Sequence, residues 1–249
     1  MKKLRLGEFE RNSLVVFAIT MIANVLSYLY QIVMGNVLTP ADYGTVNTLL
    51  SLSVVVGVPS GIISALTATY TAKYHAHGET FAIAAFMHGM LRVAAVLAAI
   101  VFVAGALLSR PIAHVLQIDD PHYVTVVMVL VASNCLGPVF SSTLQGVKRF
   151  IPYSMNSVLS FAFRLLLGVI FVWLGWGIPG ALAALILAAC LTMLYCLFKS
   201  RDLFFAPVKE KLALDRTEIR RYFVSTFWFQ LFLLLMANGD VLLIKTFAA

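Results

Sequence analysis

The sequence is dominated by seven apolar stretches, each long enough to cross a lipid bilayer and separated from the next by a polar segment. An α-helix rises about 1.5 Å per residue, so roughly 20 apolar residues cross the hydrocarbon core. The stretches run over 12–34, 44–70, 81–108, 123–144, 153–174, 178–198 and 223–247. Because a backbone in lipid must satisfy its own hydrogen bonds, the pattern predicts an all-α integral membrane protein of about seven transmembrane helices.

The composition supports this class. Of the 249 residues, 61% are hydrophobic and only 12% are charged, whereas soluble domains carry about 25% charged residues. In a soluble chain the net charge of +7 would suit nucleic acid, but in a membrane protein Lys and Arg accumulate in cytoplasmic loops. We therefore expect membrane lipids as partners and no nucleic acid.

The placement of Lys and Arg orients the predicted helices. Most of the 18 Lys and Arg residues fall on the side of the membrane that holds the N-terminus. Only Arg110 and Lys245 fall on the other side, and Arg92 and Arg164 fall within spans. The positive-inside rule then predicts a multi-pass protein of the inner (cytoplasmic) membrane with a cytoplasmic N-terminus.

Glycine and proline mark three turns or breaks. The short polar segment 38–44 predicts that the first two spans lie antiparallel as neighbours. The segment GVPSG at 57–61 predicts a kink in the second span, or a close approach by another helix. The segment GWGIPG at 175–180 predicts a tight turn between the fifth and sixth spans.

Charged residues inside the spans cost roughly 2.5–3.5 kcal/mol each on insertion scales, so each needs a structural or functional reason. Arg164 lies at the middle of the fifth span, and it follows Asn156 and Ser160 at intervals of four residues. This spacing places the three on one helix face, which is predicted to face the bundle interior or a wet cavity. Arg92, in the third span, either lines that cavity or extends to the membrane interface.

Two further spans carry polar stripes. They comprise Asn24, Ser27, Tyr28 and Gln31 in the first span, and Ser60, Ser64, Thr67 and Thr71 in the second. Together with the fifth span they favour one water-filled cavity, whose predicted substrate-binding residues are Arg164, Arg92, Asn156, Ser160, Asn24 and Gln31. The competing interpretation is that these side chains join helices by hydrogen bonds.

The sequence contains no recognisable catalytic constellation. It lacks a Gly-rich phosphate loop, a nucleophile elbow and a Cys or His cluster at metal-ligand spacing, so we expect neither an enzyme nor a cofactor or metal site. Cys135, Cys190 and Cys196 lie in apolar stretches and are expected to be small buried side chains. Asp119 and Asp120 precede Pro121 and predict a turn or a helix cap.

The connection between the first two spans carries a family signature. Its residues are Gly35, Leu38, Pro40, Asp42, Tyr43 and Gly44. It resembles the polysaccharide transporter (Wzx-type oligosaccharide flippase) branch of the MOP exporter superfamily. The resemblance implies two six-helix bundles joined by a cytoplasmic linker. In this chain, 1–198 would be the first bundle, 199–221 the linker with an amphipathic helix, and 222–249 the seventh helix, which opens a second bundle.

The resemblance also implies a function. Such proteins flip lipid-linked oligosaccharide or polysaccharide precursors across the cytoplasmic membrane by alternating access. Arg164 would suit a lipid-linked anionic glycan, because a guanidinium pairs bidentately with phosphate and stays charged. Asn238 and Asp240 match an Asn-x-Asp setting in the seventh helix of the family, where Asp240 would bind a coupling ion or form an ion pair. A complete member has 12 or more spans, so the chain would work with a second copy or a separate C-terminal half.

Two other functions stay open. One is a MATE-like small-molecule exporter; such exporters handle cationic drugs and favour carboxylates in their cavities, whereas this chain has two Arg and one Asp inside its spans. The other is a non-transporting membrane scaffold for envelope polysaccharide assembly. A membrane-embedded transferase would need a larger catalytic loop than the outer loops provide.

Overall fold

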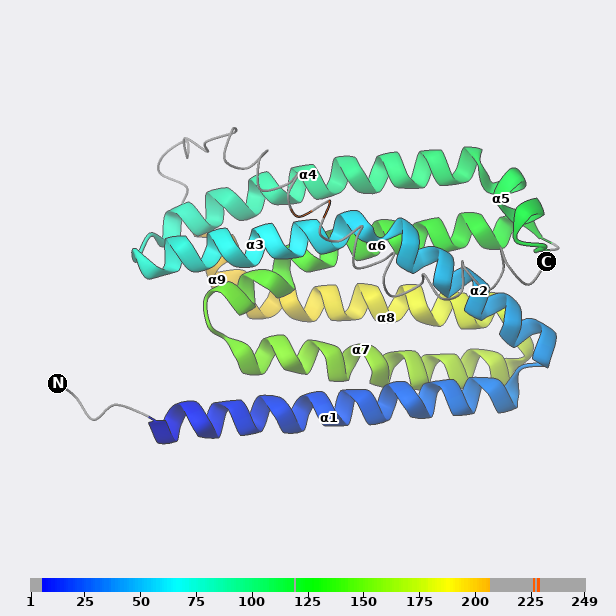
Figure 1. The fold of residues 1–249 in the computed structure, drawn as a ribbon, viewed down its shortest axis with the longest axis horizontal. Coiled ribbons are helices and arrows are strands. Elements are labelled where there is room, and N and C mark those ends of the chain that lie inside the picture. Colours follow the sequence, from blue (N-terminus) through cyan, green and yellow to red (C-terminus); the bar gives the residue numbers. More distant parts are fainter. Residues whose placement is uncertain (1–5, 119, 207–225, 227, 229–249) are drawn as a thin grey trace.

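The computed structural model describes residues 6–118, 120–206, 226 and 228. Within these ranges the chain forms helices and turns without a strand (Figure 1). The helices are α1 (Leu6–Val37), α2 (Pro40–Val56), α3 (Val58–Ala76), α4 (Thr80–Leu107), α5 (Ser109–Val115), α6 (Pro121–Gly146), α7 (Phe150–Phe171), the π-helical turn η1 (Val172–Trp176), α8 (Gly177–Lys199) and α9 (Arg201–Phe204). The predicted all-α class is confirmed.

By length and composition, the described residues hold four segments that could cross a bilayer, or five if the bent pair α2 and α3 makes one span. α1, α4 and α6 are three of them. The apolar segment Phe150–Lys199 has 50 residues, and a turn divides it into α7 and α8, which lie antiparallel (Figure 1). Asp240 and the rest of the predicted seventh span, 223–247, apart from residues 226 and 228, lie outside the described residues.

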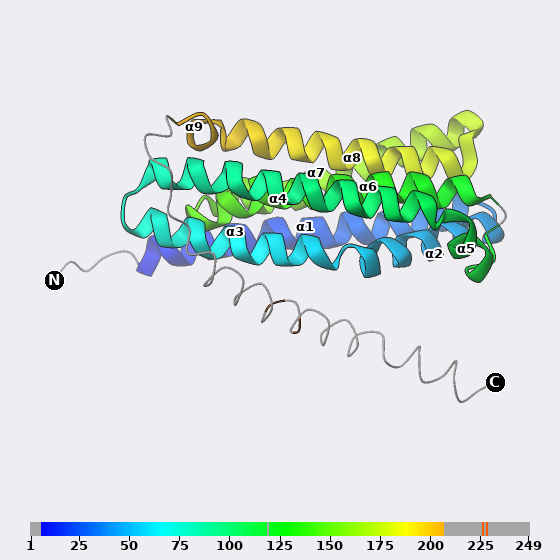
Figure 2. The ribbon, with the colours of Figure 1, turned by 90° about the horizontal axis from the view of Figure 1, so that it is seen from above.

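α6 lies at the centre of the bundle (Figures 1 and 2) and packs against α3, α4 and α8. Its apolar side chains contribute to all three buried clusters of the core. Val131 joins the cluster built with α1, α2 and α8, Val139 joins the cluster with α3 and α4, and Leu144 joins the cluster near α9. This central position explains why α6 is apolar around most of its circumference.

The connection between α1 and α2 is shorter than the sequence suggested. Only Leu38 and Thr39 separate the two helices, because Pro40 takes the first helical turn, where its missing N–H costs nothing. The Thr39 hydroxyl caps α2 by accepting a hydrogen bond from the backbone N–H of Asp42 at 3.2 Å.

α1 packs chiefly against α7, whereas α2 crosses toward α6 and α8 and meets α1 only near the connection (Figure 1). The prediction that the first two spans lie antiparallel as neighbours is therefore wrong beyond their connection. A short loop fixes where two helices meet but not the angle at which they separate, and here the second span is bent.

The bend between α2 and α3 measures 49° and confirms the predicted kink. It is centred on Gly57, where a Cβ atom would lie 2.7 Å from the carbonyl oxygen of Ser53. Pro59 follows in the first turn of α3, where it cannot donate a backbone hydrogen bond. The Ser60 hydroxyl donates to the carbonyl oxygen of Gly57 at 2.6 Å, and so satisfies a backbone group at the break.

The turn between α7 and α8 also follows the prediction. Gly175 has φ 85° and Gly177 has φ 50°, a left-handed backbone that glycine adopts at little cost. At the same end of the bundle the Asp120 carboxylate accepts a hydrogen bond from the N–H of His122 at 2.8 Å, which confirms the predicted cap.

Basic residues gather at the opposite end of the bundle, where the α3–α4 and α6–α7 connections and α9 lie together (Figures 1 and 2). The described members of this group are Lys73, Lys148, Arg149, Lys199 and Arg201. Arg110 lies on α5, at the other end. This sorting agrees with the predicted topology, while the cytoplasmic assignment of the basic end stays a prediction.

Candidate functional site

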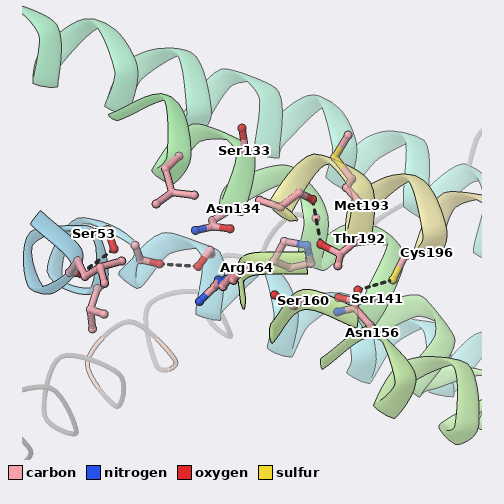
Figure 3. A pocket seen from close by; sticks show the side chains of 18 of the residues that line it. Ser53, Ser133, Asn134, Ser141, Asn156, Ser160, Arg164, Thr192, Met193 and Cys196 are labelled. Atoms are coloured by element: carbon pink, nitrogen blue, oxygen red, sulfur yellow. Dashed lines mark hydrogen bonds between the residues drawn. The ribbon is translucent and has the colours of Figure 1, made fainter. Parts of the chain in front are cut away.

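A cavity of about 640 Å³ lies between α2, α6, α7 and α8 (Figure 3). Its polar lining consists of amide, hydroxyl and guanidinium side chains and one thiol. These residues are Asn47, Ser51, Ser53, Ser60, Ser133, Asn134, Ser141, Asn156, Ser160, Arg164, Thr192 and Cys196. A cavity of this size and polarity inside an apolar bundle favours a polar ligand over a lipid chain.

Arg164 lines this cavity and also a smaller one of about 120 Å³ next to it. The second cavity is bounded by α1, α2 and α7, and Asn47 borders both. The guanidinium group lies 5.5 Å from the ring centroid of Phe161, within cation–π range. Figure 3 shows Arg164 and Asn134 reaching into the same space from α7 and α6.

The positive charge of Arg164 has no carboxylate partner among the described residues that line the two cavities. Among the described residues that line them there is no Asp or Glu, and the buried Nε of Arg164 makes no hydrogen bond. The hydroxyl of Tyr30, which lines the smaller cavity, is also buried without a hydrogen-bond partner. A buried polar group without a partner needs an explanation, and a ligand that enters the cavity is one. An anion or an uncharged polar ligand with acceptor oxygens would satisfy these groups.

The polar stripe of α7 faces the cavity as a unit. Asn156, Ser160 and Arg164 all line it, as the spacing along the helix predicted. Asn156 is held by α8, because Cys196 donates a hydrogen bond from Sγ to its Oδ1 at 3.2 Å. The three side chains therefore present amide, hydroxyl and guanidinium groups along one wall (Figure 3).

The stripe of α1 is divided. Ser27 and Gln31 border the smaller cavity beside Arg164. Asn24 and Tyr28 are exposed on α1 and border neither cavity. Of the two predicted binding residues on this helix, the structure brings Gln31 to the site and leaves Asn24 outside it.

The stripe of the second span serves mainly to pack helices. Ser60 borders the large cavity, but the Ser64 hydroxyl lies 2.8 Å from that of Ser142 and joins α3 to α6. Thr67 and Thr71 are fully buried in the bundle. The expectation that three complete stripes share one cavity is therefore wrong for this span. Ser64 joins two helices, as the competing interpretation predicts, whereas the hydroxyls of Thr67 and Thr71 are buried without a hydrogen-bond partner among the described residues.

Arg92 lies apart from both cavities. It is exposed on α4, in accord with the interpretation that its side chain extends toward the membrane interface. One turn away, His88 stacks on the ring of Phe204 in α9, with ring centroids 4.4 Å apart.

Sequence reasoning missed the contributions of α2 and α6 to the cavity. Asn47 and Ser51 are spaced by four residues, and Asn134 and Ser141 by seven, so each pair shares a helix face. Ser133 and Pro138 lie beside the α6 pair and also line the cavity. The helical period that identified the α7 stripe would have found both pairs.

Residues 9–249 match the family model described as polysaccharide biosynthesis protein. No curated protein matches the chain in a sequence search.

Solved structures of MOP superfamily transporters share the fold. An outward-facing multidrug resistance MATE transporter superposes with a TM-score of 0.65 at 18% identity, over 88% of this chain and 52% of its own. A MATE protein in complex with MaD3S gives 0.67 at 17% identity, over 91% and 54%. A MOP superfamily transporter from Pyrococcus furiosus gives 0.63 at 15% identity, over 88% and 52%.

The chain thus spans about half the length of these solved transporters. The expected MOP-type fold is confirmed by this likeness, and the family by the match over nearly the whole sequence. The chain belongs to the polysaccharide biosynthesis protein family, and its described helices have the fold of half of a MOP superfamily transporter.

Proposed function

We propose that the chain forms the first helical bundle of a transporter that moves lipid-linked anionic oligosaccharides across the cytoplasmic membrane. The family match supports a role in polysaccharide biosynthesis, and the fold supports transport by alternating access between two bundles. In this proposal the polar head of the substrate enters the large cavity while its lipid chain stays in the membrane. The second bundle comes from further chain, from a second copy or from a separate C-terminal half.

The observation that carries the proposal is the state of Arg164. Its guanidinium group lies in a polar cavity in the middle of the bundle, without a carboxylate among the described lining residues. An arginine remains charged when it leaves water, and its planar donors match two oxygens of a phosphate. Asn156 and Ser160 extend the same wall with groups that bind sugar hydroxyls.

A MATE-like exporter of small molecules is the second candidate, because several neighbours in fold are MATE proteins. The charge of the cavity argues against cationic drugs as cargo. The Pyrococcus furiosus transporter offers a precedent, since the reversed polarity of its binding pocket was taken to suggest a different function. Asp240 stays a predicted site for a coupling ion or an ion pair, and a non-transporting scaffold would leave Arg164 without a role.

The test is complementation of glycan export in the complete protein. We expect Arg164→Ala to abolish export and Arg164→Lys to retain part of it, since Lys keeps the charge but loses the bidentate geometry. Arg92→Ala is the matched control, because it removes an arginine that lies outside both cavities. Full export by Arg164→Ala, with normal protein levels in the membrane, would contradict the proposal.

A further inference from the structure

A second hollow lies on the other side of the α7–α8 pair, and its lining is apolar where that of the large cavity is polar. It is a groove of about 900 Å³ lined by α7, α8 and the start of α9. Its walls are apolar, with Leu159 and Phe163 from α7 and Leu191 and Leu194 from α8. The polar cavity uses the other faces of the same two helices, so α7 and α8 form a wall between the two spaces.

Two cations stand at the basic end of this groove. Lys199 and Arg201 both line it, and each lies over an aromatic ring that lines it as well. Nζ of Lys199 is 5.9 Å from the ring centroid of Tyr195, and Cζ of Arg201 is 4.7 Å from that of Phe198. These contacts hold the two charges at the rim of the groove.

Asp202, the described carboxylate next to them in the sequence, pairs with another residue. Asp202 follows Arg201 in the sequence but forms a two-pronged ion pair with Arg149, which also donates to the carbonyl oxygen of Lys199 at 2.9 Å. The described residues supply no carboxylate partner for Lys199 or Arg201. The end of the groove therefore combines an apolar channel with two positive charges that no described carboxylate pairs with.

We propose that this groove binds one anionic phospholipid of the cytoplasmic leaflet, with an acyl chain along α7 and α8 and its phosphate beside Lys199 and Arg201. Basic pockets at the cytoplasmic ends of transmembrane helices recognise anionic head groups, and the apolar walls match an acyl chain. The site is separate from the transport cavity, so it does not depend on which substrate is carried.

Native mass spectrometry of the full chain, supplied with equal amounts of phosphatidylglycerol and phosphatidylcholine of identical chains, tests this assignment. We expect one phosphatidylglycerol to be retained in preference to phosphatidylcholine. Lys199→Gln and Arg201→Gln should each weaken its binding roughly fivefold. Lys148→Gln is the matched control, since Lys148 is an exposed cation at the same end that does not line the groove.

Two substitutions of Leu194, one larger and one smaller, test the groove without changing its charge. Leu194→Trp should fill the groove and remove the bound lipid, whereas Leu194→Ala should leave it bound, with both variants unfolding at similar temperatures. Equal retention of the two lipids, or unchanged binding in the Lys199→Gln/Arg201→Gln variant, would overturn the proposal. So would displacement by inorganic phosphate, a preference for a polyisoprenyl phosphate, or cross-linking of Leu194→Cys to another protein segment.

Discussion

Cys196 on α8 donates a hydrogen bond from its Sγ to Oδ1 of Asn156 on α7, at 3.2 Å. Both residues line the large cavity, so this bond sets the orientation of a predicted binding residue. With its oxygen engaged by Cys196, Asn156 has its amide NH₂ available for a ligand. A cysteine that sequence reasoning treated as a small apolar side chain thus also has a polar partner.

Replacement of Cys196 should reveal this bond. Cys196→Ser retains a donor and should keep stability near that of the parent, whereas Cys196→Ala should lower the free energy of unfolding by roughly 0.5–1.5 kcal/mol. A double-mutant cycle with Asn156→Ala, measured by thermal unfolding in detergent, isolates the coupling. Additive effects of the two alanine substitutions would show that the bond contributes nothing.

The α3–α6 contact should be intolerant of a single methyl group. A Cβ atom at Gly146 would lie 2.7 Å from Cβ of Thr71 and 2.8 Å from the carbonyl oxygen of Ala68. Gly146→Ala should therefore destabilise the bundle by about 1–3 kcal/mol through overpacking. Gly137→Ala, in the same helix with no atom within 4 Å of its Cβ position, should be neutral or stabilising. Equal unfolding temperatures for the two variants would refute the close packing.

The Arg149–Asp202 pair should contribute stability at neutral pH and lose it in acid. The hydrogen bond from Arg149, aided by its charge, lowers the pKa of the Asp202 carboxyl below its ordinary value. Because the pKa of Asp202 is lower in the folded state, the ion pair stabilises the fold fully above the unfolded pKa of about 3.9. That stability disappears as the pH falls through the pKa of the folded state.

We expect Asp202→Asn to cost about 1 kcal/mol or less at pH 7, because both side chains are about half exposed. Unfolding measured from pH 7 down to pH 3 should show the parent and the variant converging. High salt should reduce the difference in stability between the parent and the variant at pH 7, because it screens the ion pair. A difference that stays constant across this pH range would contradict the ion-pair explanation.

Thiol labelling should distinguish the cavity from the packed face of the second span. In a background of Cys135→Ala, Cys190→Ala and Cys196→Ser, a cysteine introduced by Ser160→Cys should react with a water-soluble maleimide, because Ser160 lines the large cavity. Thr67→Cys should be protected, since Thr67 is fully buried. Labelling of both positions, or protection of both, would contradict this division.

The sequence predicted well those features that depend on a few neighbouring residues. The glycines of the α7–α8 turn and the Asp120 cap depend on a few consecutive residues. The α7 stripe was predictable because Arg164 is costly in lipid, which forces its face inward.

Other features depend on which helices meet. Ser64 and Ser60 occupy one stripe, yet Ser64 contacts Ser142 on α6, whereas Ser60 bonds to the backbone at the helix break of its own span and borders the large cavity. A hydroxyl group is cheap enough in a helix to serve either purpose, so the pattern alone does not decide between them. In the same way, no local signal indicates that α1 pairs with α7 instead of α2.

α2 extends as one helix from the break at Gly57, so a small change of angle there moves its far end by a larger distance. α2 has 17 residues, so its far end at Pro40 lies roughly 25 Å from the break. Each change of about 10° at Gly57 would carry that end about 4 Å over this length. The two-residue connection would pass the displacement to the end of α1. Because Asn47 borders both cavities from α2, the direction that α2 takes from this glycine places Asn47 beside the space that Arg164 lines.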